Sequence, residues 1–585
     1  MKNLAQFFNC YLQKGLDKKS VGQISKGSIH SYTRAEYQII LHTLMQGLVP
    51  LGLVPQCKVG ILSHTSLEWH LIDMAVMLAR GIVVPIYPNY LAEQAAFIIN
   101  HAECGIVFLE NDPQFEKFLT IQGETTQVHT VITFRDISPT LQSQLRPEIK
   151  HLTYQDLLAI GRQKIQENPQ FWDFKLGEVQ GQDIASIIYT SGTTGEPKGA
   201  VITHHALCSM LFNAQRTFAH EFTSNDSTFT FLPLSHVLGR VNSLLPLILD
   251  VENIFAESME RLMDHLPLAQ PSLLVAVPRI FEKIYDKVIL SLDKGPAAKK
   301  MLYYWAENVS NKYFDKLDHH QKPGPWDIWQ KKLAYRLVFS TIKKRLGGKI
   351  RYLVSGGAPL SVEIFKFLRN CGLTLLEGYG LTETVAPCFI NTPERQIPGS
   401  VGKPMVDVEY KLAPDNEILI KTEAMFSGYY KDPEATNEAI KDGWFHTGDI
   451  GSFNSEGFLI ITDRKKDIII TSGGKNVAPQ MIESKLKNSK LIAHAMIIGD
   501  RRKYLTAILS LEKDAFRPLR HDLNLPHHFS YQQLIDNPRV REIVSMEVDK
   551  INQELARFEA IKKFIISPEE FSINHGHLTP SLKVK

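Results

Sequence analysis

The 585-residue sequence has few cysteines and almost no excess of charge of either sign. Its six cysteines are widely spaced and none forms a Cys-x-x-Cys pair: Cys10, Cys57, Cys104, Cys208, Cys371 and Cys388. This pattern argues against a zinc cluster or a disulfide framework and favours a reducing compartment. Because 65 basic residues nearly balance 62 acidic ones, the sequence also gives no reason to expect nucleic-acid binding.

Long apolar runs are also missing. Residues 1–15 have neither the continuous apolar core nor the small-residue cleavage site of a signal peptide. The best candidate for a membrane span, residues 72–88, contains Asp73, Arg80 and two prolines, whereas a span needs about 20 apolar residues. We therefore expect a cytoplasmic protein, and peripheral contact with a membrane surface stays open.

Short apolar segments alternate with longer amphipathic ones through the first two thirds of the chain. The apolar segments predict strands at residues 58–63, 81–86, 104–110, 130–134, 184–189, 273–277 and 350–355. Helices are expected at 67–79 and 279–287, and residues 287–334, which are basic and aromatic, predict a helical excursion at the surface. This alternation is typical of an α/β sheet with helices on both faces. After about residue 395, short segments with many turns predict a small antiparallel sheet or barrel, and residues after about 464 predict an α+β unit.

A glycine-rich loop, YTSGTTGEPKG at residues 189–199, follows the strand expected at 184–189. Small residues allow the backbone to approach an anion, and hydroxyl and backbone N–H groups donate to phosphate oxygens. The candidate phosphate-binding residues are Thr190, Ser191, Gly192, Thr193, Thr194, Gly195 and Lys198. The loop does not match the Walker pattern, because Pro197 and Gly199 flank the lysine. On composition alone, a flexible surface turn is the alternative.

The longer string YTSGTTGEPKGAVITH, residues 189–204, resembles the signature loop of the adenylate-forming superfamily. This superfamily includes acyl-CoA synthetases, luciferases and peptide-synthetase adenylation modules. Further motifs in the family's order extend the resemblance over essentially the whole chain. It implies an α/β fold with a large N-terminal domain, residues 1–463, made of two doubly wound α/β subdomains and a small β-barrel-like subdomain. A small mobile α+β C-terminal domain, residues 464–585, would follow, with a hinge near Lys466.

The resemblance also implies a nucleotide site. The segment SGGAPLS resembles the loop that packs against adenine, and EGYGLTET resembles the motif in which tyrosine stacks on adenine, threonine contacts the α-phosphate and glutamate binds Mg²⁺. These motifs supply Gly356, Gly357, Ala358, Glu377, Gly378, Tyr379, Gly380, Thr382 and Glu383. Carboxylate and hydroxyl oxygens suit Mg²⁺, so Glu383 and Thr190 are the candidate metal ligands. A structural Gly-Gly turn and a solvated surface acid are the alternatives for these segments.

Later motifs resemble the parts of the family that bind ribose and CoA. Asp449 in WFHTGDIG and Arg464 in DRKKD match the ribose-contacting pair. Gly473, Gly474 and Lys475 match a segment near the pantetheine channel. In the tail LTPSLKVK, Lys583 matches the lysine that stabilises the transition state of adenylation. The chain ends two residues later, so Lys585 is the second candidate for this role.

The segment LPLSHVLGR resembles the part of the family that faces the substrate carboxylate and the acyl tunnel. His236 is its candidate catalytic residue, with Lys583, Thr190 and Glu383, and Arg240 is a candidate gate. A satisfied core histidine is the alternative for His236. Residues 83–87 and 277–283 resemble long-chain fatty acyl-CoA synthetases.

The resemblance therefore implies an enzyme that uses ATP, Mg²⁺ and CoA to convert a fatty acid into acyl-AMP and then acyl-CoA. Two other functions stay open: a fatty acyl-AMP ligase that passes the acyl group to a carrier protein, and a non-catalytic nucleotide- or acyl-binding protein on the same fold. The sequence does not decide between a monomer and a homodimer. Residues 287–340 are the candidate membrane-contacting surface.

Overall fold

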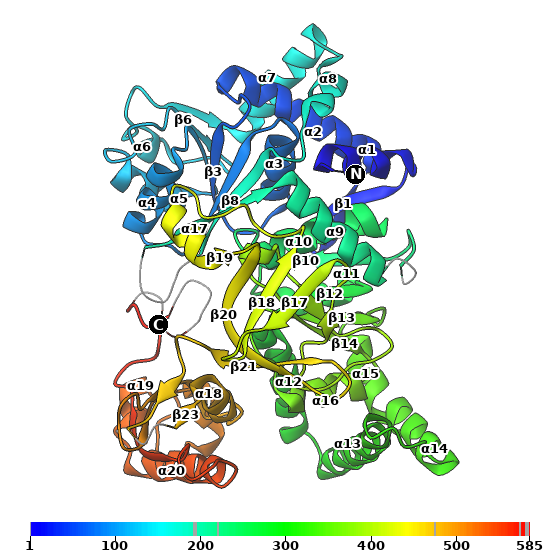
Figure 1. Cartoon of the computed structure of the whole chain (residues 1–585), viewed down its shortest axis with the longest axis vertical. Coiled ribbons are helices and arrows are strands. Elements are labelled where there is room, and N and C mark those ends of the chain that lie inside the picture. The colour runs from blue at the N-terminus through cyan, green and yellow to red at the C-terminus, as the bar shows by residue number, and fades with distance from the viewer. Residues whose placement is uncertain are drawn as a thin grey trace. The chain divides into compact units, whose positions relative to one another are not determined.

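The computed structural model describes residues 2–190, 196–218, 222–472, 475–572, 575–578 and 584 (Figure 1). The chain divides into two compact units. Unit 1 comprises Met1–Tyr410 and Ile420–Phe445, and unit 2 comprises Lys411–Leu419 and His446–Lys585. Among the described residues, no helix combines the length and apolar character needed to cross a bilayer.

The first sheet of unit 1 has seven strands in the order β7-β6-β5-β3-β4-β8-β9. Six are parallel, and β9 runs antiparallel to β8. The strands are β3 (Lys58–Leu62), β4 (Ile82–Ile86), β5 (Ile106–Leu109), β6 (Thr130–Thr133), β7 (Lys150–Thr153), β8 (Ile184–Thr190) and β9 (Lys198–Thr203). All five strands expected in this region are confirmed, to within two residues at each end.

Helices cover both faces of this sheet. Alternate residues of β5 enter different clusters of buried side chains: Ile106 and Phe108 pack in one, and Val107 and Leu109 in the other. Since successive side chains of a strand point to opposite faces, both faces are apolar and covered. The surrounding helices are α1 (Leu4–Gln13), α2 (Arg34–Leu48), α3 (Leu67–Leu78), α4 (Ala92–Ala102), α5 (Asp112–Ile121), α6 (Pro139–Gln142), α7 (Tyr154–Glu167) and α8 (Phe171–Glu178). This is the doubly wound arrangement that the sequence predicts.

The second sheet has nine strands in the order β16-β15-β14-β13-β12-β10-β11-β1-β2. The six strands from β14 to β1 are parallel. The strands are β1 (Lys19–Ser25), β2 (Ser28–Thr33), β10 (Ser227–Thr230), β11 (Glu252–Phe255), β12 (Leu273–Ala276), β13 (Tyr352–Ser355), β14 (Thr374–Tyr379), β15 (Phe389–Ile390) and β16 (Lys403–Pro404). Its helices are α9 (His204–Phe218), α10 (Val237–Leu249), α11 (Leu262–Ala269), α12 (Pro278–Asp293) and α16 (Val362–Asn370).

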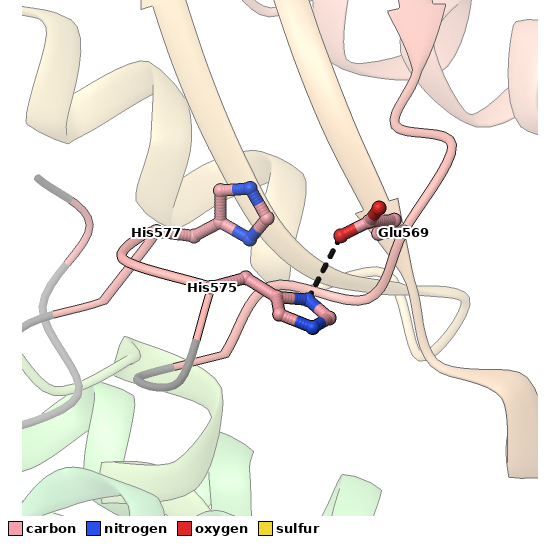
Figure 2. A group of neighbouring side chains, drawn as sticks. All are labelled: Glu569, His575 and His577. Atoms are coloured by element: carbon pink, nitrogen blue, oxygen red, sulfur yellow. Dashed lines mark ion pairs between the residues drawn. The ribbon is translucent and has the colours of Figure 1, made fainter.

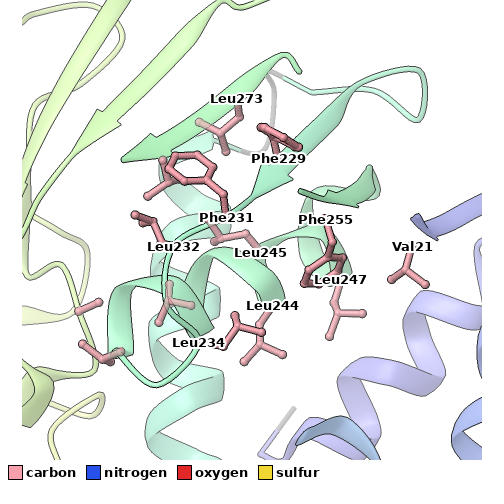
Figure 3. Close-up of a cluster of buried hydrophobic side chains, with 14 of the residues drawn as sticks. Val21, Phe229, Phe231, Leu232, Leu234, Leu244, Leu245, Leu247, Phe255 and Leu273 are labelled. Carbon is pink, nitrogen blue, oxygen red and sulfur yellow. The ribbon is translucent and has the colours of Figure 1, made fainter. Parts of the chain in front are cut away.

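The core beside this sheet is packed by α10 and strands β10 and β11. Leu244, Leu245 and Leu247 of the helix lie in the same buried cluster as Phe229 and Phe255 of the strands (Figure 3). Twelve of the thirteen residues of α10 are buried, and Leu238 is half-buried. A helix that is buried on almost every side is typical of a large core, so this packing fixes the position of the segment before α10.

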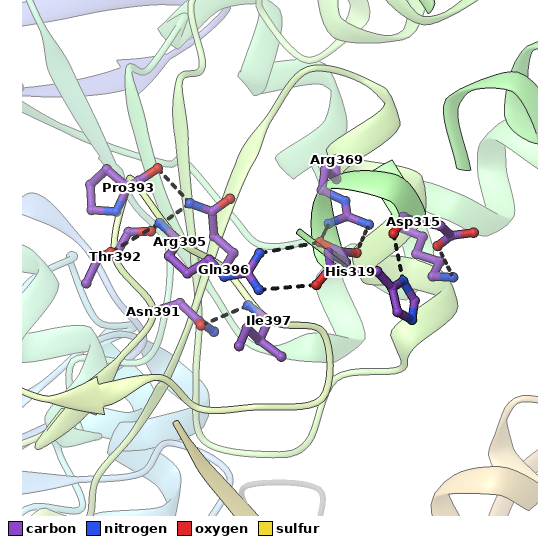
Figure 4. Close-up of polar contacts among 11 residues, drawn as sticks. Asp315, His319, Arg369, Asn391, Thr392, Pro393, Arg395, Gln396 and Ile397 are labelled. Carbon is purple, nitrogen blue, oxygen red and sulfur yellow. Dashed lines mark hydrogen bonds and ion pairs between the residues drawn. The ribbon is translucent and has the colours of Figure 1, made fainter. Parts of the chain in front are cut away.

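A helical excursion separates β12 from β13, as the sequence predicts. After α12, it contains α13 (Ala297–Asp318), α14 (Pro325–Ala334), a π-helical turn (Tyr335–Phe339) and α15 (Ser340–Arg345). The end of α13 is anchored, because Arg369 of α16 donates two 2.9 Å hydrogen bonds to the Asp318 carboxylate. Arg395, in the loop after β15, donates to the Asp318 carbonyl at 3.4 Å (Figure 4).

The remaining chain forms two smaller sheets and a hairpin. The five-stranded sheet contains β17 (Val408–Leu412), β18 (Glu417–Thr422), β19 (Ile440–Lys441), β20 (Trp444–Phe453) and β21 (Leu459–Arg464), with α17 (Pro433–Ala439) before β19. Unit 2 continues with β22 (Ile469–Ile470) and β23 (Asn476–Val477), then a sheet of β24 (Ile492–Ile498), β25 (Leu505–Leu511) and β26 (Ile561–Ile566). Its helices are α18 (Pro479–Lys487), α19 (Tyr531–Ile535) and α20 (Pro538–Asn552). The small sheet and the terminal α+β unit are both confirmed.

Candidate active site

Three of the predicted site segments lie at one edge of the nine-stranded sheet. Residues 232–240, 355–361 and 377–384 follow or complete the parallel strands β10, β13 and β14 at their carboxyl ends. Strands β13 and β14 are direct neighbours, with Ser355 opposite Glu377. In open α/β sheets, ligands bind at the carboxyl ends of the strands. The fold therefore collects the predicted adenine-, phosphate- and acyl-facing segments at the edge where a ligand is expected.

Glu383 is connected to the glycine-rich loop through a tyrosine. It is buried in a short 3₁₀ turn (Thr382–Thr384), and the Tyr429 hydroxyl donates a 2.8 Å hydrogen bond to its Oε1. The Lys198 ammonium lies 5.3 Å from the centroid of the Tyr429 ring, within cation–π range. Thr190 Oγ1 donates to the Lys198 carbonyl at 3.4 Å. Tyr429 thus contacts both Glu383, the predicted metal ligand, and Lys198 at one end of the predicted phosphate-binding loop. Thr190, at the other end of the loop, is bonded to Lys198.

The oxygen donors at Glu383 and Thr190 fit Mg²⁺, which prefers carboxylate and other hard oxygen ligands and binds substrate phosphates at the same time. Mg²⁺ sites of this kind use only one or two protein carboxylates. The buried Glu383 carboxylate, held by Tyr429, satisfies that requirement.

Glu377 is a second buried carboxyl group in the same motif. Burial raises its pKa from the ordinary value of 4.5 to about 8, although the backbone N–H groups of Leu360 and Gly399 favour the charged form. Its Oε2 has no hydrogen-bond partner among the described residues. Glu377 is therefore mostly neutral at pH 7 and adds no charge to the site.

Glu377→Gln should remove a pH-dependent loss of stability. The unfolded chain releases this proton near pH 4.5, whereas the folded protein holds it up to about pH 8. The wild type therefore loses stability as the pH rises between these values, and glutamine, which stays neutral, does not. Urea midpoints at pH 5 and pH 8 measure the difference. Glu438→Gln, at an exposed position, is the control, and the same pH dependence in Glu377→Gln and wild type would contradict the assignment.

The glycines in the two motifs differ in whether the structure requires glycine at their positions. A Cβ at Gly380 would lie 2.2 Å from the Ala386 carbonyl oxygen, so packing alone requires glycine there. Gly357 has φ +83°, in the left-handed region that favours glycine. After the end of β13, Gly356 is buried, whereas Gly357 and Ala358 are exposed. A Cβ at Gly378 would lie 3.4 Å from the Phe389 carbonyl oxygen. Close packing therefore does not require glycine at this position, whereas it does at Gly380.

Tyr379 and Thr382 lie on either side of Gly380. Tyr379 ends β14 and is half-buried, with its ring centroid 6.3 Å from that of Phe389. Thr382 is buried in the 3₁₀ turn that carries Glu383. The ring of Tyr379 is thus partly accessible at the ligand edge of the sheet, and the adenine-stacking role stays a prediction.

His236 caps helix α10. Its Nδ1 accepts a 3.2 Å hydrogen bond from the Leu238 N–H, so the ring is half-buried at the start of the helix. Gly239 allows this tight entry, because a Cβ there would lie 2.2 Å from the Pro233 carbonyl oxygen. The structure therefore gives His236 a capping contact, and its proposed contact with the substrate carboxylate stays a prediction.

Arg240 lies one turn further along α10 and is buried. Its guanidinium forms an ion pair with the buried Asp73 of α3, including a 3.3 Å contact from Nε to Oδ2. The guanidinium carbon also lies 5.9 Å from the Trp69 ring centroid. Removing one partner of such a pair leaves an uncompensated buried charge. A gating role would require Arg240 to leave Asp73, and it stays a prediction.

In unit 2, the two residues predicted to contact ribose face each other. Asp449 on β20 is directly opposite Arg464 on β21, and Arg464 Nε lies 3.1 Å from Asp449 Oδ1. Asp449 is buried and Arg464 is exposed. A carboxylate can accept hydrogen bonds from hydroxyl groups, which is what ribose binding requires.

The predicted hinge residue, Lys466, is exposed in the turn between β21 and β22. The N–H groups of Asp467 and Ile468 close this turn on the Arg464 carbonyl, at 3.0 and 3.1 Å. Lys475 is also exposed, and its carbonyl accepts a 3.0 Å hydrogen bond from the Thr471 N–H. Nine candidates lie outside the described residues: Ser191, Gly192, Thr193, Thr194, Gly195, Gly473, Gly474, Lys583 and Lys585.

Comparison with known proteins identifies the family. The AMP-binding enzyme family matches residues 13–430, and the AMP-binding enzyme C-terminal domain matches residues 466–573. The chain belongs to the AMP-binding enzyme family. This AMP-binding enzyme is similar to a long-chain-fatty-acid–CoA ligase of Mycobacterium bovis, with 32% identity over 541 residues that cover 92% of this chain and 87% of the relative. A peroxisomal long chain acyl-CoA synthetase of Arabidopsis thaliana is 32% identical over 93% of this chain and 77% of its own.

Solved structures confirm the fold of this AMP-binding enzyme. The adenylation domain of a carboxylate reductase from Mycobacterium chelonae superposes with a TM-score of 0.78 and 20% identity, covering 100% of this chain and 88% of that domain. The α/β fold with a large N-terminal and a small C-terminal domain is thus confirmed. The position of the boundary at residue 464 stays a prediction.

Sequence reasoning assigned no functional role to two residues that contact or adjoin the predicted site and hinge residues. Tyr429 contacts both Glu383 and Lys198, and no motif singled it out. Lys465 pairs with Asp415 at 2.6 Å and Glu417 at 2.9 Å, beside the predicted hinge. Both depend on partners far away in the sequence, so local patterns carried no signal for either of them.

Proposed function

We propose that this AMP-binding enzyme activates a long-chain fatty acid in two steps. In the first, a carboxylate oxygen attacks the α-phosphorus of ATP and pyrophosphate leaves, giving acyl-AMP. In the second, the CoA thiol loses its proton and attacks the acyl carbon, so that a C–S bond forms and AMP leaves. The observation that carries the proposal is the Thr190–Lys198–Tyr429–Glu383 contact chain. The names of the relatives support a long-chain acid as substrate.

Each predicted site residue has a part in this scheme. Mg²⁺, held by Glu383 and Thr190, would neutralise phosphate charge when bound. Lys198 supplies a fixed positive charge near the loop, and Tyr429 holds the Glu383 carboxylate in place. Asp449 and Arg464 would orient the ribose. Lys583 would stabilise the charge that develops during adenylation, and Gly473, Gly474 and Lys475 would line the approach of CoA.

Pyrophosphate release with a series of fatty acids from short to long chains tests this function. We expect release with long-chain acids, and a thioester when CoA is added. Release without a CoA thioester, together with acylation of a carrier protein, would support the acyl-AMP ligase instead. A protein that binds ATP and releases no pyrophosphate with any acid would be the non-catalytic alternative.

We further propose that rotation about Lys466 separates the two steps, because adenylation and thioester formation require different groups around the same acyl carbon. Lys466→Pro should preserve acyl-AMP formation and greatly reduce thioester formation. Proline removes neither donor of the turn-closing hydrogen bonds, which are the N–H groups of Asp467 and Ile468, but it fixes φ of residue 466 and restricts Lys465. Single-turnover assays of each step measure the effect, with Lys466→Ala as the control. Unchanged thioester formation in Lys466→Pro would contradict the proposed hinge role of Lys466.

We also propose that the α13–α14 excursion contacts membrane surfaces. Its most exposed apolar side chains are Met301 (73%), Trp326 (64%), Trp329 (52%) and Leu337 (50%). The two tryptophan rings stack with centroids 4.8 Å apart. Exposed Lys332 and Arg336 follow them on the same helical segment. Tryptophan beside basic residues is typical of helices that lie in the interface of anionic bilayers.

The double variant Trp326→Ser/Trp329→Ser should bind anionic vesicles at least about tenfold more weakly. Full burial of one large apolar side chain contributes about 1.5–3 kcal/mol, and 1.4 kcal/mol corresponds to a factor of ten. Co-sedimentation with phosphatidylglycerol vesicles measures binding. Phe174→Ser, which removes an aromatic ring of 63% exposure from α8, is the matched control. An equal loss of vesicle binding in the double variant and in Phe174→Ser would contradict a membrane-contacting surface at the two tryptophans.

A further inference from the structure

Unit 2 contains a cluster of metal-ligating side chains that the proposed reaction does not use. Glu569, His575 and His577 each place one ligand atom within 4.8 Å of the other two (Figure 2). His575 Nδ1 lies 2.8 Å from Glu569 Oε2. Glu569 and His575 are exposed, and His577 is half-buried. The cluster is therefore open to solvent on one side and supported by the protein on the other.

The turn that carries the cluster is fixed to the three-stranded sheet. The Phe571 N–H donates a 3.2 Å hydrogen bond to Ser510 Oγ of β25. The N–H groups of His577 and Leu578 both donate to the Ser572 carbonyl at 3.1 Å. These bonds hold the backbone at Phe571 and at His577, which both follow Glu569 in the sequence.

The ring of His577 is held by packing and offers an unused nitrogen. It lies 5.2 Å from the Phe571 ring, which itself stacks on His494 of β24 with centroids 5.9 Å apart. His577 Nδ1 is buried and has no hydrogen-bond partner among the described residues. An unpaired buried nitrogen is costly unless it finds a partner. A bound cation would supply one.

Two imidazole nitrogens and one carboxylate oxygen form a ligand set typical of Zn²⁺, with a fourth position left for water. Mg²⁺ and Ca²⁺ prefer all-oxygen sets, so this site differs in chemistry from the one at Glu383. Tetrahedral Zn²⁺ with bonds of about 2.0–2.1 Å requires ligand atoms roughly 3.4 Å apart. His575 Nδ1 and Glu569 Oε2 would have to move slightly apart from 2.8 Å, which their exposed side chains allow.

We propose that Glu569, His575 and His577 form a Zn²⁺ site. The ion links the segment after β26 to the residue just before Leu578, whose backbone pairs with Val584. Binding therefore restrains Glu569, His575 and His577 relative to one another. This inference does not depend on the proposed function, because its test measures the metal and the backbone and not turnover.

Titration of the full-length, metal-depleted protein with Zn²⁺ in a calorimeter tests the site. We expect one ion per chain, and affinity at least tenfold lower in His575→Ala and in His577→Ala. His528→Ala is the matched control, because it removes an exposed histidine of the same unit that lies outside the cluster. Unchanged affinity in His575→Ala, or no saturable binding in the wild type, would overturn the site.

A second measurement guards against variants that fail to fold. Zn²⁺ should slow amide hydrogen exchange in a peptide covering residues 569–578 of the wild type and of His528→Ala, but not of His575→Ala. Circular dichroism of the metal-free variants shows whether each is folded. Folded His575→Ala that gains the same Zn²⁺-dependent protection as the wild type would overturn the proposal.

Discussion

Replacing Glu383 with glutamine should lower ATP turnover by about 10²–10³-fold without unfolding the protein, the size expected when a group that stabilises transition-state charge is lost. Glutamine has nearly the same volume, and its carbonyl oxygen can still accept the hydrogen bond that Tyr429 donates to Oε1. The negative charge that is proposed to attract Mg²⁺ disappears. Pyrophosphate release measured over a range of Mg²⁺ concentrations should show both a lower rate and a higher Mg²⁺ requirement. A normal Mg²⁺ dependence would refute the metal assignment.

Tyr429→Phe separates the charge of Glu383 from its orientation. The variant keeps the ring that lies 5.3 Å from Lys198 but loses the hydroxyl that donates to Glu383. Loss of one hydrogen bond to a charged group costs about 1.5–3 kcal/mol. We therefore expect ATP turnover to fall less in Tyr429→Phe than in Glu383→Gln. A rise in the Mg²⁺ requirement without a change in ATP affinity would identify Tyr429 as a positioning residue.

Several strands and helices, such as β1, β11 and α4, were not singled out by the sequence. The strands that were predicted followed from local patterns, because each is a short apolar run between turn residues. The errors are at the ends. Residues 104–110 predict a strand, but β5 begins at Ile106, because the Cys104 N–H still donates to the Ile99 carbonyl at the end of α4. Glu103, with φ +59°, ends that helix in the left-handed region. Apolar character alone does not distinguish a helix cap from the start of a strand.

The contacts that shape the site could not be predicted. Tyr429 and Glu383 are 46 residues apart, and Arg240 and Asp73 are 167 apart. Such pairs are set by how the two sheets and their helices pack, which local periodicity does not encode. Motif resemblance singled out Glu383, Asp449 and Arg464 but gave no reason for their positions. The structure supplies one: β13 and β14 are parallel neighbours, and β20 and β21 place Asp449 opposite Arg464.

Lys583→Ala should reduce acyl-AMP formation by about 10²–10³-fold and leave thioester formation from supplied acyl-AMP nearly unchanged. A lysine ammonium is a compact point charge, and its proposed role is to stabilise negative charge that develops only in the first step. The two half-reactions are measured separately, by pyrophosphate release and by CoA consumption with synthetic acyl-AMP.

Lys585→Ala is the matched control for this experiment, because it removes the same charge two residues further along the chain. If Lys583 has the proposed role, Lys585→Ala should retain most of the adenylation rate. A selective loss in Lys585→Ala would move the role to that residue. Equal losses in both half-reactions of Lys583→Ala would show that the lysine supports the C-terminal unit as a whole and not the transition state of adenylation.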